Sequence, residues 1–217
     1  MNTEAVRDVL EGTIGLAPAR LDAKRGRREK AGRKMQRLMG GLAVALAVVA
    51  CAGGASAGEV RLGAGPSGHD LVIQVDDGGQ EQGSSFVADY VFDSPAVLSA
   101  IGSPRPYVGT SISLSGYTNF VDAGLLYRVG GRRLYGEFAL GLAAHDGELD
   151  PSPTEPDQIA FGSRVLLHFG LAAGYRLDER WAVELSTQHW SHGGVFDDSH
   201  NDGADVLAIR VARRLGD

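Results

Sequence analysis

The residues whose types and spacing could do chemistry are His189 and Ser191, with an acid further along at Asp205. Side chains at positions i and i+2 of a β-strand point to the same face, so the imidazole and the hydroxyl would emerge together. An acid that orients a histidine, which in turn deprotonates a serine, is the arrangement of nucleophilic acyl transfer. The three residues predict a Ser-His-acid site, provided that the strands around them bring Asp205 to His189.

The residues next to this group could support it. Gly193 and Gly194 follow the serine, and glycines allow backbone N–H groups to turn toward a developing oxyanion. His192 lies between them and Ser191, where its ring could donate a hydrogen bond. Asn201 opens an Asn-Asp-Gly sequence, which signals a turn just before Asp205. We expect these four residues to assist the site.

Each residue also has a plainer interpretation. A His-x-Ser pair on a strand is common, and Asp205 could simply start a strand after a turn. Trp190 could be an interfacial anchor in an aromatic belt. His145, His168 and His192 fit turns or filler positions better than metal ligands, since no His/Cys/carboxylate spacing predicts a metal site. We expect neither a metal nor another cofactor.

The flanking residues define the face on which His189 and Ser191 lie. The same parity carries apolar and small residues, whereas the opposite parity is mostly polar: Val183, Leu185 and Thr187 against Glu184, Ser186, Gln188 and Trp190. A water-soluble hydrolase rarely puts its nucleophile on an apolar face unless that face lines a pocket. A membrane barrel that acts on lipid would do so.

Similar alternation recurs along the chain, with turn residues between the stretches and almost no helical periodicity. The expected strands are residues 86–92, 107–115, 120–129, 134–142, 165–175, 181–191 and 205–215, with weaker candidates at 60–64 and 71–75. One face of these strands is large and apolar, and the other mixes Gly, Ala and Ser with a few charged residues. Tight turns at 130–131 and 178–179 alternate with long loops at 143–162 and 192–204. This pattern predicts an all-β protein, an eight-stranded antiparallel transmembrane β-barrel with a narrow, small and polar interior.

The N-terminal segment predicts export. Residues 35–57 have a basic start, an apolar stretch and the small-residue run Ala55-Ser56-Ala57, as in a secretory signal peptide cleaved near Ala57. Residues 1–34 are interpreted as an upstream extension or mis-assigned start, with translation from Met35, or alternatively as a cytoplasmic leader or anchor. The only cysteine, Cys51, could instead mark a lipoprotein cleavage box. The barrel domain would be residues 58–217.

The expected domain is strongly acidic. From Gly58 onward the chain has 11 arginines, no lysine and 22 acids, which is a net charge of −11. Nucleic acid is therefore not an expected partner, because no basic stripe is available to neutralise phosphates.

Beyond these patterns, the chain resembles the outer-membrane lipid A 3-O-deacylases of the PagL type over essentially the whole region from Gly58. The likeness is strongest in residues 105–109, 143–147, 162–166, 174–176 and 189–205. The resemblance implies an eight-stranded barrel with a Ser-His-Glu triad on its lipid-facing surface. Ser191 would be the nucleophile, His189 the general base, and Asp205 would stand where the family has Glu.

Two departures from the family pattern matter. The family usually has Asn directly after the serine, where it assists the oxyanion hole, and this chain has His192. The acid is one methylene shorter than Glu, so Asp205 has to approach His189 more closely.

The sequence therefore predicts an esterase of the Gram-negative outer membrane that removes an ester-linked acyl chain, the 3-O-linked one, from lipid A. Its expected partners are lipopolysaccharide and outer-membrane lipids, with a homodimer as a further option. The rival from another class is a non-catalytic small barrel with a structural or ligand-binding role, in which replacing Ser191 or His189 changes nothing. A soluble secreted β-sandwich is a third alternative.

Overall fold

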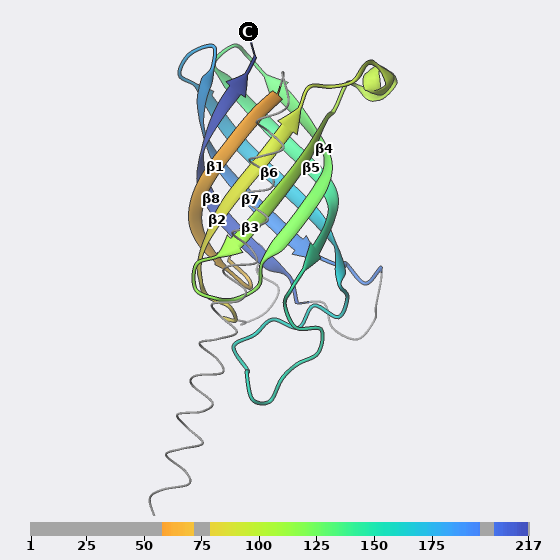
Figure 1. Ribbon diagram of the computed structural model, residues 1–217, viewed down its shortest axis with the longest axis vertical. Coiled ribbons are helices and arrows are strands. Elements are labelled where there is room, and N and C mark those ends of the chain that lie inside the picture. Colours follow the sequence, from red (N-terminus) through yellow and green to blue (C-terminus); the bar gives the residue numbers. More distant parts are fainter. Residues whose placement is uncertain (1–57, 72–78, 196–201, 217) are drawn as a thin grey trace, which may run out of the picture. The chain divides into compact units, whose positions relative to one another are not determined.

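The computed structural model describes residues 58–71, 79–195 and 202–216. Within these residues, eight antiparallel strands pair in chain order and close into a barrel through the β1–β8 pairing (Figure 1). The elements are β1 (Gly58–Gly68), β2 (Gly83–Phe92), the 3₁₀ helix η1 (Ala96–Ile101), β3 (Arg105–Ser113), β4 (Phe120–Gly130), β5 (Leu134–His145), β6 (Val165–Arg176), β7 (Trp181–Ser191) and β8 (Ala204–Leu215). The predicted fold class is confirmed.

The strand boundaries differ from prediction mainly at the start. β1 is a full 11-residue strand rather than the short stretch 60–64, although its second half is rich in glycine and includes Pro66. The candidate strand 71–75 begins at a bend at Leu71, and its remaining residues lie outside the described part of the chain, as do the signal peptide and residues 1–34. No helix in the described ranges is long and apolar enough to span a membrane.

The two faces of the barrel wall have opposite composition. On β5–β7 the outward positions are large and apolar and remain exposed, for example Leu140, Leu171 and Leu185. The inward positions are buried and mostly small or polar, and the large exceptions are Tyr135, Leu166 and Trp190, so the expected small and polar interior holds only in part. An apolar outside around a polar inside is the arrangement of a barrel surrounded by lipid.

The interior is divided into two parts along its length. Toward the long loops it is filled by a buried apolar cluster: Val87, Phe120, Ala143, Ile159, Phe161, Leu166, Trp190, Ala204, Val206 and Ala208. Ile159 and Phe161 come from the β5–β6 connection, which therefore folds back into the barrel mouth rather than forming only the external loop expected at 143–162. Toward the tight turns, the interior is filled by charged side chains.

The short connections at the turn end fit their sequences. Gly130 ends β4 with φ +134°, and the N–H of Gly131 donates to the carbonyl of Leu134 across the β4–β5 turn. In the β6–β7 turn, the carboxylate of Asp178 accepts the N–H groups of Arg180 and Trp181 at 2.7 Å each. These turns fix the register of β4 with β5 and of β6 with β7, and the second turn thereby helps to set the positions of residues at the far end of β7.

Candidate active site

The register of β7 and β8 brings the predicted group together. His189 and Asp205 are direct cross-strand partners in this antiparallel pair. Such partners have Cβ atoms about 4.5–5.5 Å apart, within reach of a short acid and an imidazole. Ser191 lies two residues after His189, on the same outward face of β7. The hairpin thus presents an acid, a base and a hydroxyl on one apolar surface.

The side chains form a continuous hydrogen-bonded chain. His189 Nδ1 lies 2.7 Å from Asp205 Oδ1, and His189 Nε2 lies 3.0 Å from Ser191 Oγ. An ionised carboxylate only accepts hydrogen bonds, so the ring proton belongs on Nδ1 and Nε2 is left to accept the proton of the serine. This is the tautomer that a general base acting on Ser191 requires.

The acid of this group is shielded, whereas the histidine and the serine are partly exposed. The Asp205 side chain is only 2% exposed, whereas that of His189 is 20% exposed and Ser191 is half-buried. The acid is shielded, which strengthens its attraction to the imidazole. The serine end of the hydrogen-bonded chain stays accessible from the outside of the barrel.

Gly203 packs directly against the base. A Cβ placed on Gly203 would lie 2.6 Å from His189 Cε1, closer than atoms can pack, and 3.2 Å from Nε2, which is a tight contact. Its carbonyl accepts a hydrogen bond from Nδ1 of His69, a buried residue of the β1–β2 connection, at 2.7 Å. The sequence suggested only a turn at Gly203, and nothing in the sequence pattern pointed to His69.

Trp190 lies between the two site residues but on the other side of the wall. It is fully buried in the lumen, stacked on Phe120 with ring centroids 4.4 Å apart and on His168 at 5.2 Å. The interpretation of Trp190 as an interfacial anchor is therefore wrong. The inward alternation of β7 places it inside, where it packs against the lumen side of the segment that carries His189 and Ser191.

Of the four residues expected to assist the site, the structure describes His192, Gly193 and Gly194. Residues 192–195 form a tight turn in which Val195 N–H donates to the His192 carbonyl, with φ +58° at Gly193 and +71° at Gly194. His192 is buried, and its Nδ1 accepts the N–H of Gly194 at 3.1 Å. In this conformation that N–H is bound to His192 rather than directed at Ser191. Asn201 lies outside the described residues.

The other histidines are built into the barrel. His168 faces the lumen, with Nδ1 2.5 Å from the hydroxyl of Tyr107. His145 ends β5, where Nε2 lies 2.7 Å from the carbonyl of Ser163. Both have structural partners and neither lies on the outward face with the triad.

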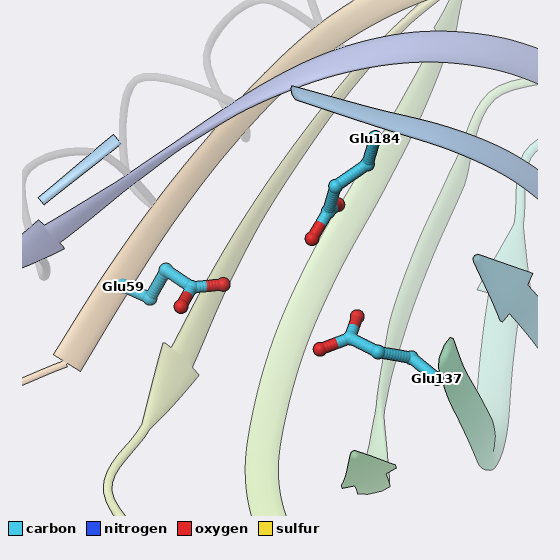
Figure 2. A group of neighbouring side chains, drawn as sticks. All are labelled: Glu59, Glu137 and Glu184. Atoms are coloured by element: carbon cyan, nitrogen blue, oxygen red, sulfur yellow. The ribbon is translucent and has the colours of Figure 1, made fainter. Parts of the chain in front are cut away.

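One group of carboxylates has metal-like spacing. Glu59, Glu137 and Glu184 point toward one another inside the barrel, with ligand atoms within 4.8 Å (Figure 2). The Arg61 guanidinium already occupies this position, 2.7 Å from Glu59, 2.6 Å from Glu137 and 3.8 Å from Glu184. The donor set therefore serves an ion-pair network and does not fit a cation site.

That network extends across the lumen. Arg128 bridges Glu59 and Glu137, and Arg210 joins Glu184 to Asp89 at 2.7 Å to each acid. Arg105 adds a longer contact to Glu59 at 3.4 Å. Among the described residues, the part of the network inside the lumen pairs four acids with four arginines: Glu59, Asp89, Glu137 and Glu184 with Arg61, Arg105, Arg128 and Arg210. Outside the lumen, Arg105 also lies 3.7 Å from the exposed Asp93. The charges inside the lumen balance, which is what burial of so many ions demands.

Comparisons with known proteins agree with this architecture. The family model described as lipid A 3-O-deacylase (PagL) matches residues 102–214. Among solved structures, the chain is similar to the outer membrane enzyme PagL, with 16% identity and a TM-score of 0.50 over 71% of this chain and 97% of that one. It is also similar to the N-terminal β-barrel domain of Pseudomonas aeruginosa OprF, with 11% identity, a TM-score of 0.45, and 73% and 99% of the two chains covered. Neisserial surface protein A gives 13% identity and a TM-score of 0.43, over 72% and 95% of the chains.

A comparison with curated proteins gave no match. The family model nonetheless covers more than half of the sequence, including β3 to β7 and nearly all of β8, and thus the His189, Ser191 and Asp205 positions. The chain belongs to the lipid A 3-O-deacylase (PagL) family.

Proposed function

We propose that this protein is an outer-membrane esterase that hydrolyses the 3-O-linked acyl chain of lipid A, with Ser191 as nucleophile. The observation that carries the proposal is the hydrogen-bonded chain from Asp205 through His189 to Ser191 on the apolar outer face. Family membership supports the substrate class.

The chemistry follows from the positions of the protons. Ser191 Oγ attacks the ester carbonyl carbon while His189 Nε2 takes its proton, and Asp205 stabilises the imidazolium. The tetrahedral intermediate then expels the sugar oxygen, which leaves as a hydroxyl with the proton from His189. A water molecule, deprotonated by His189, hydrolyses the acyl-serine and releases the fatty acid. The products are a free sugar hydroxyl and a free acid.

The substrate would approach along the outer wall. Leu167 is the cross-strand partner of Ser191 on β6, and Phe169 is the partner of His189. Both belong to the apolar outward face, so an acyl chain lying on this wall meets the same environment as in the bilayer. Binding would use the membrane itself, which explains a site on a convex surface instead of a deep cleft.

The donor for the oxyanion is proposed to come from the 192–195 turn, the segment that directly follows the nucleophile. With His192 Nδ1 accepting the Gly194 N–H, the neutral ring carries its proton on Nε2. A rotation of the turn on substrate binding would be required to direct a Gly193 or Gly194 N–H at the reacting carbonyl. Loss of one such donor costs about 10²–10³ in rate.

Mass spectrometry of lipid A from cells that express the wild type, Ser191→Ala or Ser186→Ala tests the proposal. Ser186 is the matched control, a serine of the same strand that faces the lumen and donates to the Ala208 carbonyl. Wild type and Ser186→Ala should remove one hydroxyacyl group, and Ser191→Ala should remove none. Deacylation by Ser191→Ala, or unchanged lipid A with wild type folded in the outer membrane, would overturn the assignment.

A further inference from the structure

The end of the barrel opposite the triad carries a concentration of arginines. We name as the arginine rim the residues Arg132, Arg133, Arg176, Arg180, Arg213 and Arg214, of which all but the half-buried Arg176 are exposed. They belong to the β4–β5 turn, the end of β6, the β6–β7 connection and the end of β8. The register brings these segments to one edge, since Leu134 pairs with Tyr175 and Trp181 pairs with Arg213.

Acids at this edge are fewer than the arginines, and two of them already accept hydrogen bonds or form ion pairs. Asp178 accepts two backbone N–H groups of its own turn, and Asp93 lies 3.6 Å from Arg214 and 3.7 Å from Arg105. Among the described residues, Glu179 is the third exposed acid at this edge. The loop end has the opposite balance among the described residues, with Arg164 against nine acids: Asp70, Glu81, Asp146, Glu148, Asp150, Glu155, Asp157, Asp202 and Asp205. The molecule is therefore polarised along its length.

Aromatic residues hold the rim at a defined depth. Tyr175 and Trp181 face outward at the border of the apolar band and are 44% and 40% exposed. The Arg133 Nη1 donates to the Tyr175 hydroxyl at 3.2 Å, and the Arg213 guanidinium lies over the Trp181 ring at 5.2 Å from its centroid. Outward Trp and Tyr mark the headgroup level of a bilayer. The guanidinium groups of Arg133 and Arg213 are thus placed at the level of lipid phosphates.

We propose that the arginine rim binds the phosphate groups of anionic glycerophospholipids in the leaflet at the turn end of the barrel. Guanidinium groups form bidentate contacts with phosphate, and basic residues at a membrane surface are attracted to anionic lipid. The part of the loop end that the structure describes is acidic and has no comparable group of arginines. The rim would hold the barrel in one orientation and at one depth, so that Ser191 remains at the opposite interface. The binding itself does not depend on deacylase activity.

Native mass spectrometry of the purified full chain tests this, with dioleoylphosphatidylglycerol and dioleoylphosphatidylcholine as probes in matched micelles. The wild type should bind phosphatidylglycerol about tenfold more tightly than phosphatidylcholine, and added salt should reduce this preference. Arg133→Gln/Arg180→Gln/Arg213→Gln should abolish it, and the triple lysine variant at these positions should keep most of it. Glu179→Gln, which removes an opposing charge at the same edge, should increase it.

Equal binding of both lipids by the wild type, or an unchanged preference in the triple glutamine variant, would overturn the proposal. If the triple variant does not fold, the salt dependence of the wild type and the single variants Arg180→Gln and Arg213→Gln decide the matter. A preference that is insensitive to salt contradicts binding through the rim. A Ser191→Ala protein should retain the full preference, which separates this test from the proposed deacylase activity.

Discussion

The proposed triad of Asp205, His189 and Ser191 and the luminal ion-pair network lie on the two faces of one barrel wall, and they use polar residues in opposite ways. On β7, Glu184 points inward to Arg210 and Arg61, and His189 points outward to Asp205 and Ser191. Inside, every acid of the network has an arginine partner. Outside, the chain of hydrogen bonds ends at a serine hydroxyl that remains accessible.

This difference separates stability from chemistry. Removal of one partner from a buried ion pair leaves an uncompensated charge, which costs about 3–5 kcal/mol. The outward group contains one buried acid, which keeps its histidine partner, and two groups near the surface. We therefore expect inward substitutions to change folding and outward ones to change the reaction.

The largest effect is expected for His189→Ala. Loss of the general base should reduce deacylation about 10⁴-fold or more, as removal of a triad member does elsewhere. The barrel should still fold, because His189 lies at the outer surface and contributes little packing, but it should lose some stability because the buried Asp205 carboxylate loses its histidine partner. Initial rates on lipid A in detergent measure the first effect, and heat-dependent mobility in electrophoresis measures the second. An unfolded variant would indicate that the outward group is structural.

Arg61→Met should have the opposite effect, a loss of stability with little change in the rate of the reaction. It leaves Glu59, Glu137 and Glu184 crowded without their shared cation, so the free energy of unfolding should fall by about 3–5 kcal/mol. The rate per folded molecule should stay near that of the wild type. Urea titration in micelles and active-site-normalised rates check the two halves. A stable but inactive Arg61→Met protein would contradict the division between the faces.

Gly203→Ala sharpens the comparison at the site itself. Its backbone φ does not require glycine, so the added Cβ acts only by displacing the His189 ring, 2.6 Å away. A displacement on the order of 1 Å costs about 10²-fold in rate. We expect that loss without a change in unfolding, measured by the same assays. Gly194→Ala is not a matched control, because φ at Gly194 is +71°. Full activity in Gly203→Ala would show that the ring has room to move.

Trp190→Phe should have the smallest effect. It changes the packing of the lumen, and through β7 it acts on His189 and Ser191 on the outer face. A phenyl ring keeps the stack on Phe120 but fills less of the lumen, so the barrel should lose about 1 kcal/mol. A reduction in kcat with unchanged KM would indicate that Trp190 positions His189 and Ser191. A loss of stability alone would assign it to packing.

The sequence was sufficient for the features that depend on alternation. A period of two defines which side chains share a face, so it predicted the strands, the barrel and the outward position of His189, Ser191 and Asp205. The direct pairing of His189 with Asp205 also required the register, which alternation alone does not give. The ends of β1 were missed because its glycines and Pro66 weaken the strand signal.

Contacts between residues far apart in the chain could not be predicted from the sequence pattern. Arg61 and Glu137 are 76 positions apart and meet only because the closed barrel brings β1 and β5 across the lumen. The contact of His69 with Gly203 spans 134 positions and joins two connections. Periodicity says which way a side chain points, and only the closed fold says what it meets there.

The central claim is that Ser191 is an activated nucleophile on the outer wall. Labelling with a long-chain alkyl fluorophosphonate in micelles, followed by peptide mass spectrometry, tests it most directly. The account predicts a single adduct on Ser191 of the folded wild type, about 100-fold slower labelling in His189→Ala, and none in Ser191→Ala. An adduct on a different residue, or equal labelling of Ser191 with and without His189, would contradict it.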